Sequence, residues 1–133
     1  LRAPDKAAIM KTRSLNFSER TCIMADGKDL EQQFHDCMPL FIALGDEMRL
    51  TIIKTLAHAV RTDHPEGLNV NEITRQTSLS RPAISHHLQI LKDSGLVEVR
   101  RRGTSNYYSP RLLSATRRLM QMGALVEDFF RQD

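Results

Sequence analysis

Three consecutive arginines, Arg100, Arg101 and Arg102, are the side chains whose type and spacing most clearly suggest a chemical role. A guanidinium carries a permanent positive charge and a fork of N–H donors that matches a phosphate group. The surrounding chain reinforces this charge. Residues 74–118 hold nine Lys or Arg against two Asp or Glu, a net charge of +7 within a chain whose formal total is +3. This segregation of charge favours a face that binds phosphates over an ordinary solvated surface.

A polar helix face is expected shortly before the arginines. Ser80 is a favourable N-cap and Gly95 suits the position just beyond a helix end, so the sequence predicts a helix from about Arg81 to Ser94. Apolar residues recur within it at the spacing of one buried face. The opposite face carries small and hydrogen-bonding side chains, which are Pro82, Ser85, His86, Gln89 and Asp93. Taken alone, this face suits a solvated surface as well as a binding surface.

Two further elements flank this helix. Asn69 and Glu72 have the spacing of a capping box and predict a short helix joined to the next one by a tight turn. On the other side, residues 96–100 alternate apolar and polar, residues 105–109 are rich in strand-forming types, and Gly103 suits the turn between them. A helix-turn-helix followed by such a hairpin is a winged helix. The predicted fold class is therefore mainly α with a small β wing (α+β).

The stretch from Leu40 to Tyr108 resembles the ArsR/SmtB family of bacterial winged-helix transcriptional regulators. Four motifs carry the resemblance in order: Ala-Leu-Gly-Asp-x-x-Arg-Leu, Ser-His-His-Leu, Leu-Lys-x-x-Gly-Leu-Val and Tyr-Tyr. The resemblance implies a homodimer that binds a palindromic operator in double-stranded DNA and represses transcription until a signal releases it. It also turns His86 towards DNA and His87 towards the domain. The DNA contacts expected on this interpretation are Ser80, Arg81, Pro82, Ser85, His86, Gln89, Arg100, Arg101, Arg102, Thr104 and Tyr107.

Two apolar stripes suggest a partner subunit. The last helix, expected over Arg111 to Arg131, repeats apolar or small residues in alternating steps of four and three, and a similar seam runs from Leu30 to Leu44. Pro39 is expected to break or kink the seam helix near Met38. We expect a second copy to cover the stripes, and packing of the two stripes on each other within one chain is the alternative. The expected dimer-interface residues are Phe34, Phe41, Leu112, Leu119, Gly123, Val126 and Phe130.

The resemblance also raises the question of metal sensing. Metal-sensing members of the family carry two cysteines at the start of the first motif helix, where this chain has Asn69 and Asn71. The family's other common site uses Asp, His and Glu along the last helix, where residues 111–131 hold no His. Neither place keeps a soft or imidazole ligand set, so we expect no metal and no cofactor. Cys37 falls in the seam, which predicts a buried inert thiol, with a thiol sensor as the alternative.

The remaining features bound the class of protein. A chain of 133 residues with 41% hydrophobic content suits one modest core. We expect an N-terminal arm over residues 1–27, whether native or partly added, and a single winged-helix DNA-binding and dimerisation domain over residues 28–133. The longest apolar run is far short of the roughly 20 residues of a membrane span. Two cysteines, Cys22 and Cys37, fit a reducing compartment, so a cytoplasmic location without membrane contact is expected. The resemblance implies that the cytoplasm is bacterial.

Catalysis and protein binding are the competing functions. The sequence contains no Ser/His/Asp set, no Cys/His pair in a plausible register and no glycine loop for phosphates, so we expect no enzyme. A winged-helix module that binds another protein is the alternative to a DNA-binding regulator. The net charge of residues 74–118 favours DNA over that alternative. The signal is left open between a small molecule and a redox reaction.

The missing ligands generate a first prediction. Zinc, nickel and cadmium should not release DNA from this protein at concentrations that saturate typical metal sensors, because both family metal sites lack their ligands. A titration of the protein–DNA complex with each metal, followed by fluorescence anisotropy, measures this. Release of DNA by a tight, stoichiometric metal complex, reversed by a chelator, would contradict the prediction.

Overall fold

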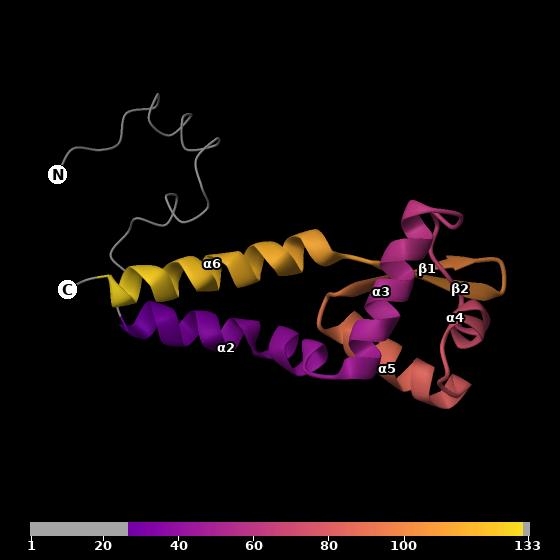
Figure 1. Ribbon diagram of the computed structural model, residues 1–133, viewed down its shortest axis with the longest axis horizontal. Coiled ribbons are helices and arrows are strands. Elements are labelled where there is room, and N and C mark those ends of the chain that lie inside the picture. The colour runs from indigo at the N-terminus through magenta and orange to yellow at the C-terminus, as the bar shows by residue number, and fades with distance from the viewer. Residues whose placement is uncertain (1–26, 132–133) are drawn as a thin grey trace, which may run out of the picture. The chain divides into compact units, whose positions relative to one another are not determined.

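The computed structural model describes residues 27–131, so the expected N-terminal arm lies outside the described residues apart from Gly27. The order of elements along these residues is four helices, a two-stranded hairpin and a last helix (Figure 1). This arrangement confirms the winged-helix fold class. The elements are α2 (Gly27–Leu44), α3 (Glu47–Arg61), α4 (Val70–Gln76), α5 (Arg81–Asp93), β1 (Val97–Arg102), β2 (Ser105–Pro110) and α6 (Leu112–Phe130).

The chain divides into two compact units. Met38–Ala115 form one unit, which contains α3, α4, α5 and the hairpin. The other unit joins residues of Leu1–Cys37 to Thr116–Asp133, so its described part consists of most of α2 and most of α6.

Side chains at the helix starts fix where α4 and α5 begin. Asn69 accepts a hydrogen bond from the backbone N–H of Glu72 at 2.9 Å, and Ser80 accepts one from that of Ala83 at 3.4 Å. Both contacts satisfy amides that have no partner within their helix. At the other end, Ser94 is the C-cap of α5 and Gly95 follows with a φ of +82°. The predicted starts of both helices are confirmed.

The core of the Met38–Ala115 unit consists of aliphatic side chains from every helix. The three apolar positions predicted for α5, Ile84, Leu88 and Leu91, are all buried. Burying one such side chain contributes about 1.5–3 kcal/mol relative to leaving it exposed. Because one face of α5 is used in this way, its other face points away from the core. The remaining fully buried large residues of the unit are Leu40, Ile52, Leu56, Leu68, Ile73 and Leu96.

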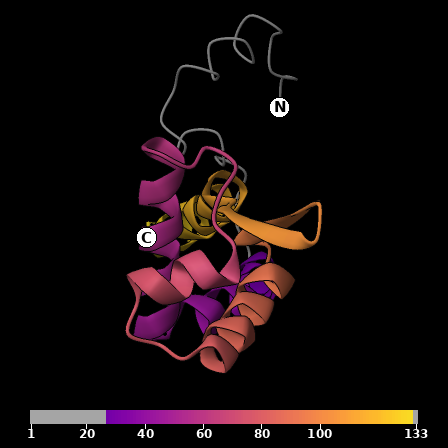
Figure 2. The same cartoon turned by 90° about the vertical axis from the view of Figure 1, so that its right-hand side faces the viewer.

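The hairpin forms the wing and projects away from the helices of its unit (Figure 2). Its strands are antiparallel, and the pairing of Arg102 with Ser105 leaves a two-residue turn in which Gly103 has a φ of +63°. A two-stranded hairpin is marginally stable alone. Here Leu68 and Tyr108 exchange two backbone hydrogen bonds, of 3.0 and 2.8 Å, which join the wing to the segment before α4. The predicted hairpin and its glycine turn are confirmed.

Part of α2 packs against part of α6 within the smaller unit. The Sγ of Cys37 lies 3.8 Å from the carbonyl oxygen of Arg118, whose guanidinium in turn donates to the carbonyl of Asp36. Cys37 is fully buried. The stripes therefore contact each other within one chain along this stretch, as the intrachain alternative proposed.

Pro39 does not break its helix. The sequence predicts a break or a kink near Met38, and the break is wrong, because α2 runs from Gly27 to Leu44 with Pro39 inside it. Proline removes the hydrogen bond to the carbonyl four residues earlier, that of His35. His35 and Pro39 are both exposed, so water can hydrogen-bond that carbonyl.

Gly67 generates a prediction about the attachment of the wing. Its φ is +96°, and a Cβ built there would lie 2.1 Å from the carbonyl oxygen of Tyr108. Changing Gly67→Ala should lower the free energy of unfolding by about 3 kcal/mol or more, because backbone strain and a clash add together. Gly95→Ala is the matched control, because Gly95 also has a positive φ but open space around it. It should cost about 1 kcal/mol. Urea denaturation measures both changes, and equal losses would contradict the clash.

Candidate nucleic-acid interface

The polar face of α5 is open to solvent. Ser85, His86 and Gln89 are exposed, whereas His87 is half-buried on the side of the domain. Gln89 donates to the carboxylate of Asp93 at 2.9 Å. If Gln89 bound the edge of a DNA base, that hydrogen bond would replace the one to Asp93. At the start of the helix, the predicted contacts Ser80, Arg81 and Pro82 are also exposed.

The three arginines are consecutive in β1, so their side chains alternate between the two faces of the hairpin. This half of β1 is called the arginine edge. Arg100, Arg101, Arg102 and Thr104 are all exposed, and 76% of the Arg100 side chain is accessible. Of the eleven predicted DNA contacts, only Tyr107 is half-buried. The structure therefore places the α5 face and the arginine edge in the same compact unit, both open to solvent.

One carboxylate organises the base of the wing. Glu98 lies 3.0 Å from Arg111 and 3.5 Å from Arg100, and it accepts a hydrogen bond from Ser109 at 3.3 Å. Its side chain is 28% accessible, whereas Arg111 and Arg100 are largely solvated. Ion pairs of this kind contribute little to stability, about 0–1 kcal/mol. Glu98 therefore pairs with Arg100 and Arg111 and cancels only part of the positive charge at the base of the wing.

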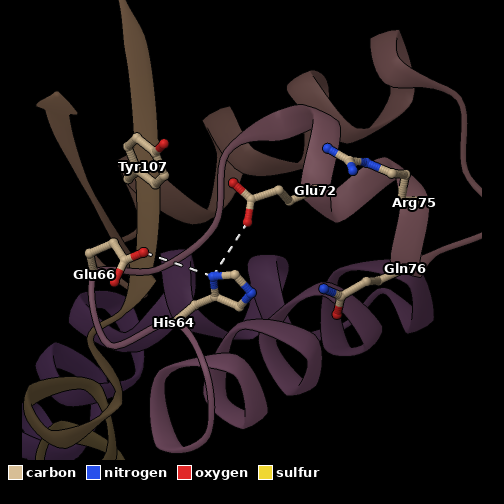
Figure 3. Close-up of a pocket in the computed structure, with 6 residues that line it drawn as sticks. All are labelled: His64, Glu66, Glu72, Arg75, Gln76 and Tyr107. Atoms are coloured by element: carbon tan, nitrogen blue, oxygen red, sulfur yellow. Dashed lines mark ion pairs between the residues drawn. The ribbon is translucent and has the colours of Figure 1, made fainter. Parts of the chain in front are cut away.

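A polar cavity of about 480 Å³ lies between α4 and the wing (Figure 3). The Nδ1 of His64 points towards two carboxylates in it, 3.8 Å from Glu66 and 3.6 Å from Glu72. Sequence reasoning placed His64 only in a connecting loop, because nothing in its local spacing indicates that it meets Glu72. The other residues that line the cavity are Arg75, Gln76 and Tyr107.

The two asparagines that stand where metal-sensing relatives are expected to carry cysteines make other contacts. Asn69 caps α4 through its side chain, as predicted, and the exposed Asn71 accepts a weak hydrogen bond from Arg75 at its carbonyl. Over residues 27–131, no group of three or more His, Cys, Asp or Glu side chains has an arrangement that could hold a metal ion.

A buried arginine lies beneath α5. Arg49 is only 9% exposed, and its guanidinium donates to the carbonyls of Ala43 at 2.7 Å and Ile42 at 2.9 Å. Asp46, the N-cap of α3, accepts from the backbone amides of Arg49 and Met48. The hydrogen bond from the Arg49 amide, followed by the charge of Arg49, holds the pKa of Asp46 below its ordinary value against a smaller opposing effect of burial.

Exposed apolar side chains mark both terminal helices. Phe34, Met38 and Ile42 are four residues apart on α2, and Ile42 is 60% exposed. Met38 and Ile42 were not among the predicted interface residues, although their spacing from Phe34 is a signal for one helix face. On α6 the exposed large apolar residues are Leu113, Met120, Phe129 and Phe130. Among the other predicted interface residues, Gly123 is exposed, and those half-buried are Phe41, Leu112, Leu119 and Val126.

The fold and the exposed, positively charged face define a winged helix-turn-helix regulator, and comparison with known proteins identifies its family. Residues 46–99 match the model of the arsR family of bacterial regulatory proteins. An HTH-type transcriptional regulator of Methanocaldococcus jannaschii is 36% identical over 77 residues, which are 58% of this chain and 80% of that protein. Another, from Mycobacterium tuberculosis, is 41% identical over 66 residues, 50% of this chain and 55% of that one.

Solved structures of similar fold also belong to transcriptional regulators. An ArsR-like transcriptional regulator from Rhodococcus sp. RHA1 has a TM-score of 0.59 at 25% identity, over 75% of this chain and 88% of that one. The transcriptional repressor BigR from Xylella fastidiosa has a TM-score of 0.54 at 26% identity, over 78% and 96%. The chain belongs to the ArsR family of helix-turn-helix transcriptional regulators and is not an enzyme. Among the described helices, none is long and apolar enough to cross a membrane.

The arginine edge generates a prediction about salt dependence. Changing Arg100, Arg101 and Arg102 together to Ala should weaken binding to every DNA sequence. It should also reduce the slope of log K against log salt by up to about 0.9 for each phosphate that the variant no longer neutralises. The matched control changes Lys54, Arg61 and Arg131 to Ala, which removes three charges outside the wing. Anisotropy titrations at several salt concentrations measure the slope. An unchanged slope in a folded triple variant would remove the wing from the interface.

Proposed function

We propose that the chain is a homodimeric repressor that binds a palindromic operator, with one α5 helix and one wing for each half-site. The observation that carries this proposal is the exposure of the polar α5 face and the arginine edge within one compact unit. The charge of the chain agrees, since residues 74–118, which reach slightly beyond that unit, carry a net charge of +7. Phosphate contacts supply affinity and base contacts supply sequence specificity, so the two surfaces have complementary roles.

Each surface has its own residues in the proposal. Ser85, His86 and Gln89 read base edges in the major groove, and Ser80 and Arg81 hold a phosphate at the start of α5. Pro82 lies against the DNA backbone beside them. The wing residues that grip the neighbouring backbone are Arg100, Arg101, Arg102, Thr104 and Tyr107.

A dimer is needed for useful specificity. The 13 residues of α5 can reach only a few base edges, and charge alone gives weak, non-specific binding. Two copies related by a two-fold axis place their recognition helices about 34–36 Å apart on one face of the duplex. The exposed apolar residues of α2 and α6, including Phe34 and Phe130, support an interface of this kind because isolated helices rarely leave such side chains in water.

The releasing signal is proposed to be other than a metal. Where metal-sensing members of the family carry a cysteine, Asn69 caps α4 with its side chain. Cys37 is buried against α6, where an oxidant has poor access to the thiol. A small molecule is therefore favoured over thiol chemistry at Cys37. A cytoplasmic, bacterial setting is part of the same proposal, since the target is genomic DNA.

Enrichment and sequencing of genomic fragments bound by the purified protein test the proposal. The expected result is a motif with two-fold symmetry whose half-sites are one helical turn of DNA apart. Recovery of fragments without a shared motif, or of a motif with no two-fold symmetry, would contradict a dimeric operator-binding protein.

The dimer generates a separate prediction. Leu119→Glu places a charge on the half-buried stripe of α6 and should give monomers that lose operator binding but keep salt-sensitive affinity for any DNA. Gln121→Glu is the matched control, because it adds the same charge at an exposed position outside the stripe. Analytical ultracentrifugation and anisotropy measure the two effects. Operator binding of wild-type strength by a demonstrated Leu119→Glu monomer would overturn the dimeric model.

A further inference from the structure

The buried guanidinium of Arg49 has a third contact, which reaches the recognition helix. Its Nη1 lies 3.4 Å from the Nδ1 of His87, 38 positions further along the chain. Arginine has five donors and no acceptor. A hydrogen bond between the two groups therefore requires Nδ1 of His87 to accept, which it does in the neutral tautomer that carries its proton on Nε2.

The contact joins α5 to the corner between α2 and α3. Arg49 is fixed on one side by the carbonyls of Ile42 and Ala43 at the end of α2, and Asp46 lies 3.7 Å from its Nη1. On the other side Arg49 contacts His87, which lies in the sequence between two proposed base-reading residues, His86 and Gln89. A rotation of α5 that moved His87 away from Arg49 would therefore move both of those side chains relative to the groove.

Protonation of His87 would destroy this contact. An imidazolium has a proton on both ring nitrogens, so Nδ1 would present an N–H and a positive charge to a guanidinium. The carboxylate of Asp46, which lies 3.7 Å from the Nη1 of Arg49, would attract an imidazolium at His87 and so partly oppose the loss. However, Asp46 already accepts from the amides of Met48 and Arg49.

The other charged groups around α5 are engaged elsewhere. On α4, Glu72 faces His64, and Arg75 contacts the carbonyl of Asn71. On β1, Glu98 faces Arg100 and Arg111, and the arginines of the wing are exposed. On α5 itself, Asp93 accepts from Gln89, and the exposed ring of His86 lies 5.9 Å from that of His87, centroid to centroid. The charged group that contacts His87 is Arg49, and Asp46 in turn lies beside Arg49, whereas Arg81 and Lys92 on α5 itself are exposed.

We propose that Arg49 is a positioning residue for DNA recognition. Its hydrogen bond to the acceptor nitrogen of neutral His87 fixes the orientation of α5, and protonation of His87 breaks that bond. The inference rests on the proposed operator binding. It predicts a protein whose specific DNA affinity falls as the solution becomes acidic. Protonation of the exposed His86 would have the opposite effect, because it adds a positive charge to the DNA-facing surface.

The first test uses the free protein. Nitrogen-15 NMR of the histidine side chains should show His87 with an unprotonated Nδ1 near neutral pH, and Arg49→Lys should shift that signal because a lysine ammonium lacks the planar fork of donors. Hydrogen exchange of the α5 amides, corrected for intrinsic rates, should be faster in Arg49→Lys than in the wild type. A proton on Nδ1 of His87, or an unchanged α5 in Arg49→Lys, would overturn the inference whether or not the protein binds an operator.

The second test uses DNA carrying the motif recovered by genomic enrichment. Between about pH 8 and about pH 5.5, specific affinity should fall about tenfold more in the wild type than in His87→Asn, whose amide oxygen can accept from Arg49 but cannot be protonated in this range. The effect of His86 is present in both proteins and cancels in the comparison. His58→Asn is the matched control, since His58 is exposed on α3, and it should behave like the wild type.

The outcomes separate the two proposals. Equal pH profiles for the wild type and His87→Asn would overturn the role of His87. If the wild type bound no DNA motif at any pH, the proposed function would fail, and the NMR and exchange measurements would still decide whether Arg49 holds α5.

Discussion

Burial of one face of α5 is the constraint on which the rest of the structure depends. Ile84, Leu88 and Leu91 are removed from water by the surrounding helices, which sets the approximate rotation of α5 about its axis. Once that rotation is set, His86 and Gln89 can only face outwards. The same packing that stabilises the unit therefore creates its binding surface, and a change in packing beneath α5 alters what the helix presents.

The wing depends on a second constraint, the close approach of two backbones. Leu68 and Tyr108 pair through both of their backbone groups, which is feasible because Gly67 has no side chain to occupy the space beside Tyr108. Positive charge is then concentrated on a hairpin that this pairing holds against the helices. Glu98 counters part of the charge at the base of the wing and leaves the arginine edge open to solvent.

Arg49 combines a structural role with a potential for control. A buried cation is costly unless its donors are satisfied, and two backbone carbonyls together with a histidine nitrogen satisfy this one. The two carbonyls cannot be protonated at ordinary pH, whereas the histidine can. The attachment of the recognition helix thus includes one contact whose strength depends on protonation, within a corner that is otherwise fixed.

The sequence by itself determined the features that depend on neighbours within a few positions. Ser80 and Asn69 begin their helices because each side chain accepts from an amide three residues later, and Gly103 forms the turn because its own φ is positive. Periodicity likewise identified the buried and exposed faces of α5, and the ordered motifs identified the family. Each of these signals is contained in the segment that it describes.

Only the tertiary structure decided the contacts between distant segments. The pairs Arg49 with His87 and His64 with Glu72 leave no trace in local spacing, because they depend on how whole helices pack. Pro39 shows the converse, since α2 continues through it at an exposed position despite the local rule against proline in helices. Local propensities are worth a fraction of what burial and long-range hydrogen bonding contribute, so the assembled core decides which distant segments meet.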